Sequence, residues 1–70
     1  MEFDVFGRRL IVERTLSGWA VFYPYEEGKR REVPGIAIPP DVLEVDIARY
    51  LADLCHEDAS PTFPDVRRIR

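Results

Sequence analysis

Cys55-His56-Glu57-Asp58 is the one cluster of chemically reactive side chains in the sequence. A thiol, an imidazole and two carboxylates are the groups used in nucleophilic catalysis and metal binding. However, neighbouring positions on the helix predicted here point about 100° apart, so these groups do not converge on one ion or substrate. The chain has no second Cys or His, which excludes an internal disulfide, a zinc site made from these two residue types alone and a Cys/His dyad set by spacing. We expect Cys55 to be a small core residue and His56 to be exposed, with no catalytic residue, metal, cofactor or enzymatic activity.

Basic and aromatic residues offer a second chemistry, namely binding to a macromolecule. The glycines are scattered at turn positions, so no phosphate-binding loop is present. If the turns at Gly7 and Gly28 lie at the same end of a sheet, four arginines cluster beside aromatic rings, as in a platform for single-stranded nucleic acid. Alternatively, the arginines shield strand edges and the aromatic residues belong to the core. The residues in question are Arg8, Arg9, Trp19, Tyr23, Tyr25, Arg30 and Arg31.

Composition restricts the class of protein. Seventy residues with 46% hydrophobic and 33% charged side chains indicate a single small globular domain, residues 1–70. The formal net charge of −3 disfavours nonspecific binding to nucleic acid or to an anionic membrane. We find no apolar run as long as the roughly 18 residues of a membrane helix and no basic-then-apolar leader, so we expect a cytoplasmic protein.

Charge is distributed unevenly along the chain. Residues 41–58 hold six acidic residues and one basic residue, a net charge of −5, whereas residues 59–70 hold three arginines and one aspartate, a net charge of +2. A basic tail and an acidic middle segment could contact each other, within one chain or between two. Alternatively, both are solvated.

Period-two patterns predict strands within residues 2–38. Alternation begins at Phe3 and Val5 and changes phase at Gly7. Either Gly7-Arg8 is a two-residue hairpin loop, which we favour, or Gly7 marks a bulge in one long strand. Residues 10–12 and 19–25 are the strongest strand segments, and residues 15–18 read as a turn between them. Residues 30–33 are predicted to pair back as a further strand.

One amphipathic helix is predicted over residues 41–57. Asp41 and Glu44 have the spacing of a capping box, and Pro61 prevents continuation beyond Ser60. The apolar arc of this helix comprises Leu43, Ile47, Ala48, Tyr50, Leu51, Leu54 and Cys55.

These elements predict an α+β fold: a small antiparallel sheet of three to four strands packed on one C-terminal helix, with an extended tail over residues 59–70. Residues 10–12 and 19–23 are apolar on both faces, although one helix covers only one face. We therefore expect the second face to be covered by a second copy of the chain, as a homodimer, or by the tail through Phe63, Val66 and Ile69.

Two resemblances to known families carry further expectations. The segments Phe3–Arg8, Val12–Arg14, Gly18-Trp19, Glu27–Arg31, Ile38-Pro39, Tyr50–Leu54 and His56-Glu57 resemble a family of short, uncharacterised bacterial proteins, a domain of unknown function. This resemblance implies a bacterial source and a cytoplasmic location. The stretch from Val12 to Pro24, followed by a single helix, is similar to HicB-type antitoxins, which implies that the sheet binds a small toxin.

Taken together, the sequence predicts a small module that acts by protein–protein contact, self-associating or binding and inhibiting a partner protein. Trp19, Tyr23 and Tyr25 are the expected anchors and the four arginines the rim, because interfaces are enriched in these residue types. Binding to single-stranded nucleic acid through the same residues is the alternative. No small-molecule substrate is indicated.

Overall fold

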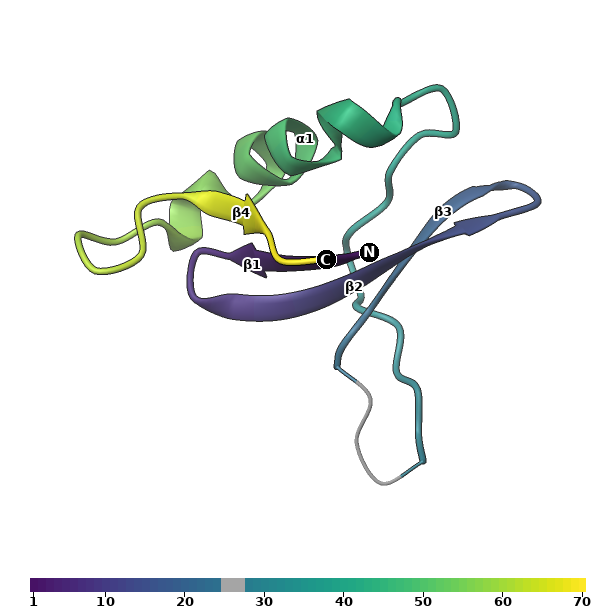
Figure 1. Ribbon diagram of the computed structural model, residues 1–70, viewed down its shortest axis with the longest axis horizontal. Helices are drawn as coiled ribbons and strands as arrows, with labels where there is room; N and C mark the ends of the chain where they lie inside the picture. The colour runs from purple at the N-terminus through teal and green to yellow at the C-terminus, as the bar shows by residue number, and fades with distance from the viewer. Residues whose placement is uncertain (25–27) are drawn as a thin grey trace.

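The computed structural model describes residues 1–24 and 28–70, and it shows an α+β fold (Figure 1). Four antiparallel strands form one sheet in the order β3-β2-β1-β4, and helix α1 lies across the face of the sheet nearest β1 and β4. The two chain ends lie side by side, since the Glu2 N–H donates to the Arg70 carbonyl over 2.9 Å. The strands are β1 (Glu2–Val5), β2 (Arg8–Thr15), β3 (Gly18–Phe22) and β4 (Val66–Arg68), and the helical segments are η1 (Glu44–Asp46), α1 (Ile47–Leu54) and η2 (His56–Asp58).

A two-residue hairpin loop joins β1 to β2, which confirms the predicted hairpin but moves it by one residue. The loop is Phe6-Gly7, and Arg8 already pairs with Val5 in the sheet. Both loop residues have positive φ, 51° at Phe6 and 90° at Gly7, as a turn matching the strand twist requires. Burial of the Phe6 ring offsets this strained backbone, and Asp4 Oδ1 accepts the Gly7 N–H over 2.8 Å. The prediction placed the change of phase at Gly7, whereas the preceding Phe6 already belongs to the loop.

Replacing Gly7 by alanine is expected to destabilise the fold more than the same change at Gly35. Both glycines have positive φ, but a Cβ at Gly7 would lie 2.8 Å from the Phe63 ring, whereas nothing lies within 4 Å at Gly35. Strain alone predicts a loss of about 1 kcal/mol for Gly35→Ala, and the added clash predicts about 2 kcal/mol or more for Gly7→Ala. Urea unfolding of both variants measures the difference, and equal losses would refute the close approach of Phe63.

Strand β3 is shorter than predicted, and the segment after Gly28 pairs with it only in part. Among the described residues, a bridge between Phe22 and Glu32 takes the place of the strand predicted over 30–33, and Val33 N–H donates to the Val21 carbonyl over 2.9 Å. Proline at position 24 lacks the N–H that a longer ladder would need. The predicted turn at residues 15–18 is confirmed as a two-residue connection between β2 and β3.

The predicted helix 41–57 is three shorter pieces, η1, α1 and η2. Asp41 does not cap it: no side chain caps η1 or α1, and the Val42 N–H donates to the Pro39 carbonyl instead. Helical structure therefore begins only at Glu44, and Leu43, which was expected on the buried arc, is 64% exposed.

The last residues of the chain add a fourth strand to the sheet, where only a tail was predicted. β4 pairs antiparallel with β1, placing Val66 beside Val5 and Arg68 beside Phe3. Arg68 occupies a position facing the helix, where a strand pattern would require an apolar residue, and its guanidinium pairs with Glu44 at 3.1 Å. This contact confirms that the basic tail meets the acidic middle segment within one chain.

The core lies between the sheet and α1. It consists of Phe3, Val5, Phe6, Leu10, Val12, Val21, Ile38, Ile47 and Leu51. The opposite face of the sheet, here called the outer face, is not covered by residues 59–70, because these residues run along the β1 edge. Its half-buried Ile11, Ala20 and Phe22 are surrounded by ion pairs instead.

Candidate interaction surface

Three arginines stack on the aromatic rings of β3 and of the residue that follows it. The guanidinium carbons of Arg14, Arg30 and Arg31 lie 4.8, 4.2 and 5.5 Å from the ring centroids of Trp19, Phe22 and Tyr23, respectively. Each contact is worth about 0.5–1 kcal/mol at an exposed site. They show why basic and aromatic residues recur in this part of the sequence.

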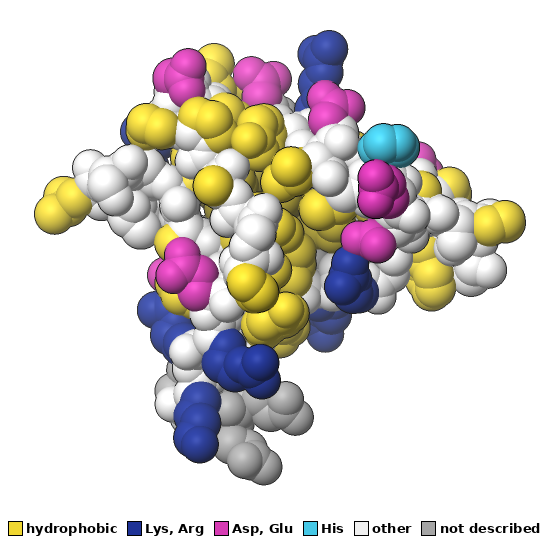
Figure 2. All heavy atoms as spheres, turned by 180° about the vertical axis from the view of Figure 1, so that it is seen from behind, with side chains coloured by type: hydrophobic (Ala, Val, Ile, Leu, Met, Phe, Trp, Pro, Cys, Tyr) yellow, Lys and Arg dark blue, Asp and Glu magenta, His cyan; other side chains and the backbone are white. Residues whose placement is uncertain are grey.

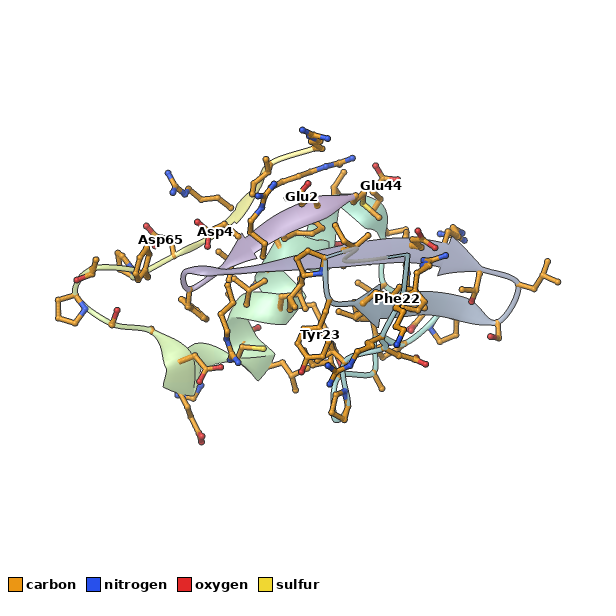
Figure 3. All side chains as sticks on the ribbon, turned by 90° about the horizontal axis from the view of Figure 1, so that it is seen from below. Glu2, Asp4, Phe22, Tyr23, Glu44 and Asp65 are labelled. Carbon is orange, nitrogen blue, oxygen red and sulfur yellow. The ribbon has the colours of Figure 1, made fainter. Side chains whose placement is uncertain are left out.

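These pairs lie on both faces of the sheet and so do not form one platform. Alternation along β3 places Trp19 and Tyr23 on the helix side and Phe22 on the outer face. Figure 3 shows Phe22 and Tyr23 at the β3 end of the sheet and Glu2 and Asp4 across it on β1, where the register places both carboxylates on the outer face. Arg8 and Arg9, adjacent on β2, likewise project to opposite faces. The four-arginine cluster considered from the sequence is therefore wrong, because strand alternation separates its members.

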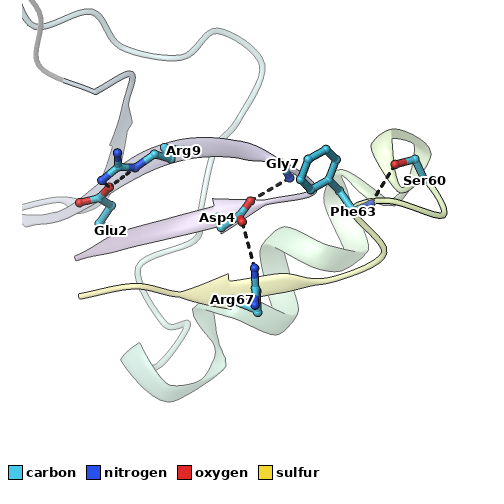
Figure 4. A network of polar contacts seen from close by, with 7 residues as sticks. All are labelled: Glu2, Asp4, Gly7, Arg9, Ser60, Phe63 and Arg67. Atoms are coloured by element: carbon cyan, nitrogen blue, oxygen red, sulfur yellow. Dashed lines mark hydrogen bonds and ion pairs between the residues drawn. The ribbon is translucent and has the colours of Figure 1, made fainter.

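Outer-face charges pair with each other. Arg9 pairs with Glu2, Arg67 Nη2 lies 3.5 Å from Asp4 Oδ2, and Arg30 pairs with Glu13 (Figure 4 shows the first two pairs). Glu2 is buried, and Arg9 and the more distant Arg70 supply its positive partners. The outer face thus has a small apolar centre inside a ring of satisfied charges.

Trp19 has a structural contact. Its indole Nε1–H donates to the Val42 carbonyl over 3.0 Å, which ties the segment before η1 to the end of the sheet. The ring is half-buried, and it packs against the core. Of the predicted anchors, Trp19 is therefore mainly a core-side residue, and Tyr25 lies outside the described residues.

Tyr23 contributes to an open groove of about 300 Å³ with a mixed apolar and polar lining, here called the Tyr23 groove. The groove lies between the connecting segment and the end of α1. Figure 2, from behind, shows hydrophobic side chains gathered over the helix and the connecting segment, with charged residues around them. The apolar lining consists of Tyr23, Val33, Pro34, Ile36, Leu54 and Cys55.

The ends of the Tyr23 groove are polar. Arg31 stacks on Tyr23, and Arg8 Nη2 lies 2.5 Å from Asp58 Oδ2. Tyr23 and Leu54 are 36% and 45% exposed, so both present apolar surface to solvent. Of the seven predicted surface residues, the structure brings together Tyr23 and Arg8, which line the groove, and Arg31, which stacks on Tyr23.

Sequence reasoning missed Leu54 as a surface residue. The helical pattern placed Leu54 on the buried arc with Ile47 and Leu51, but α1 ends at Leu54, and of these three residues Leu54 alone is exposed. The sequence did contain one sign that the helix is shorter: Asp58 falls on its apolar arc and interrupts it. The path of residues 33–36, which form the other wall, had no local signal.

Cys55 lies in the wall of this groove, half-buried against the core. Burial raises the pKa of the Cys55 thiol above its ordinary value, the charge of Asp58 raises it further, and Arg8 opposes both effects. The thiolate is the nucleophilic form, so this environment suppresses reactivity at neutral pH.

Alkylation of folded protein by iodoacetamide is therefore expected to rise with pH along a curve whose midpoint lies above that of the urea-unfolded chain. The raised pKa favours the folded state below the unfolded-state pKa, and this stabilisation is lost as the pH rises through the folded-state pKa. Mass-spectrometric alkylation rates over a pH series measure the midpoint. A folded midpoint below the unfolded one would contradict the buried-thiol description.

The described residues contain no group of three or more His, Cys, Asp or Glu side chains that could hold a metal ion. Within the same part of the chain, no helix combines the length and the apolar character needed to cross a membrane.

Comparison with known proteins gives a family but no activity. No curated protein and no solved structure matches the chain significantly. The model of one protein family matches the whole chain, residues 1–70, in agreement with the expected resemblance to an uncharacterised family. The chain therefore belongs to the family described as Domain of unknown function (DUF7661).

Proposed function

We propose that this protein is a protein–protein interaction module and that the Tyr23 groove is its main docking surface. The observation that carries the proposal is the exposed apolar pair Tyr23 and Leu54 in one groove, with Arg31 stacked on the tyrosine. Tyrosine and arginine are enriched among the residues that dominate binding energy, and they act best beside a pocket that excludes water. A partner side chain in this groove would cover both exposed residues.

The outer face is less suited to this role. Its arginines and carboxylates already satisfy one another, so a partner would have to break these pairs or bury them, and burial of charges costs free energy. For a homodimer, this favours contact through the helix-side groove over contact through the outer face.

The partner in this proposal is another protein or a second copy of the chain. Inhibitory binding of the kind found in HicB-type antitoxins, in a bacterial cytoplasm, is one form of the first case. Binding to single-stranded nucleic acid is the alternative function, and it requires the same arginines to leave their carboxylates and rings.

Affinity capture tests the proposal when groove and control variants are compared. Tagged wild type, Leu54→Ser and Leu16→Ser are incubated with lysate of the source cells, in parallel samples with and without nuclease. Leu16 is a matched control, because it is fully exposed (110%) in the turn between β2 and β3, away from the groove. We expect a stoichiometric protein with wild type and Leu16→Ser, and its loss with Leu54→Ser.

Two other outcomes would overturn the proposal. Capture that disappears on nuclease treatment would favour nucleic-acid binding. Equal capture by all three chains would place the docking surface elsewhere. Light scattering at high micromolar concentration separates the two partner classes, because a dimer mass sensitive to Leu54→Ser identifies a second copy.

A further inference from the structure

The two edges of the sheet are treated differently. At the β3 edge the chain covers itself: Tyr23 N–H donates to the Arg31 carbonyl, and Val33 N–H donates to the Val21 carbonyl, both over 2.9 Å. At the other edge, β4 has no such cover among the described residues.

Some main-chain N–H and C=O groups of β4 point outward, away from β1. Phe6 N–H donates to the Asp65 carbonyl, and Ile69 N–H donates to the Glu2 carbonyl, so these pairs are the hydrogen-bonded ones of the antiparallel ladder. The intervening pairs, Val5 with Val66 and Phe3 with Arg68, are therefore the non-bonded ones. The N–H and C=O groups of Val66 and Arg68 consequently face outward, and no described residue hydrogen-bonds to them.

A cleft of about 580 Å³ lies above this edge, between α1 and β4. Ala48 and Ala52 of α1 and Val66 of β4 line this cleft, and the small alanine side chains leave space between the helix and the strand. A strand added beside β4 would direct every second side chain toward the helix side, where this cleft lies.

Two arginines flank the cleft. Arg49 lines it from α1, and Arg67 lines it from β4, where the register directs its side chain to the outer face beside Asp4; His56 and Asp65 complete the polar lining. Arg49 forms no ion pair with any described carboxylate, and Arg67 has only the 3.5 Å contact with Asp4. These cations contrast with the net negative charge of the chain.

We propose that the β4 edge binds an extended segment of a partner protein in which acidic and apolar residues alternate. The segment adds a fifth strand through the outward main-chain groups of Val66 and Arg68. Its apolar side chains lie on Ala48 and Ala52 on the helix side, and its carboxylates, at the alternate positions, lie beside Arg67 on the outer face. The inference rests on the proposed function in one respect, that the ligand is a protein. The binding surface is different, because it is the β4 edge and not the Tyr23 groove.

Fluorescence anisotropy with synthetic peptides tests this proposal on the intact chain. The probe is a fluorescein-labelled peptide of alternating valine and aspartate, and the control peptide has lysine in place of aspartate. We expect saturable binding of the acidic peptide, with a Kd increased about tenfold or more by Arg67→Glu. Arg14→Glu, which removes an exposed arginine on β2, is the matched control and should leave the Kd unchanged.

Backbone methylation separates strand addition from simple charge attraction. Two further peptides carry N-methyl groups on either the odd or the even amides, and a strand pairs through only one of these sets. We expect one methylated peptide to lose binding about tenfold or more and the other to bind like the unmodified probe. Equal affinity of both for the protein would overturn the proposal, as would no binding at about 1 mM peptide or equal affinity for the lysine peptide.

Failure of the β4-edge proposal can be distinguished from failure of the proposal for the Tyr23 groove. Leu54→Ser should bind the acidic peptide like wild type, because Leu54 does not line this cleft. A loss of peptide binding in Leu54→Ser with folding retained would assign the peptide to the groove and overturn the β4-edge inference.

Discussion

Leu51→Ala is expected to leave this protein largely unfolded at room temperature. Leu51 is 0% exposed and lies in the core that α1 shares with the sheet. Truncating a buried leucine costs about 2–5 kcal/mol, whereas a core of this size supplies only about 3–5 kcal/mol of net stability. Circular dichroism during urea titration measures the loss as a reduced midpoint or as a missing folded baseline.

Leu54→Ala is the matched control on the same helix. Leu54 is 45% exposed at the end of α1, so its truncation should cost about 1 kcal/mol or less. Similar losses for the two variants would contradict the orientation of α1 described above.

Tyr23→Ala is expected to reduce partner affinity by about 30-fold or more, the effect of a residue worth about 2 kcal/mol in an interface. Tyr23 is half-exposed at the groove and supports Arg31, so its removal takes away both the apolar contact and the position of the arginine. Biolayer interferometry with the captured partner measures the change, with Leu16→Ala as control. A loss of less than about threefold, with unchanged unfolding free energy, would exclude Tyr23 as an anchor.

The sheet could be predicted from the sequence where its apolar residues alternate cleanly. Leu10, Val12 and Val21 follow the period of two and form the core side of β2 and β3. β4 escaped prediction because Arg68 occupies an inward position that a strand pattern would assign to an apolar residue. Its charge is satisfied by Glu44, 24 residues away in the sequence, and a local pattern contains no trace of that contact.

The candidate surface was predictable from the sequence only as far as residue types go. Residue type alone singled out Tyr23, Arg31 and Arg8, because aromatic residues and arginines are typical of interfaces. The exposure of Leu54 depends on where α1 ends, and the opposite wall depends on the path of residues 33–36. Of the two coverings expected for the second sheet face, a second copy of the chain or the tail, the tail was wrong, since β4 uses the last residues to extend the sheet instead.

Site-specific photo-crosslinking tests the central claim, that the Tyr23 groove binds a protein, most directly. Benzoylphenylalanine replaces Tyr23 in one chain and Leu16 in another, and both are irradiated in the source cells. We predict a discrete protein adduct from position 23 that is absent from position 16 and persists after nuclease treatment. An adduct of equal yield from both positions, or none from position 23 in a chain that is folded, would contradict it.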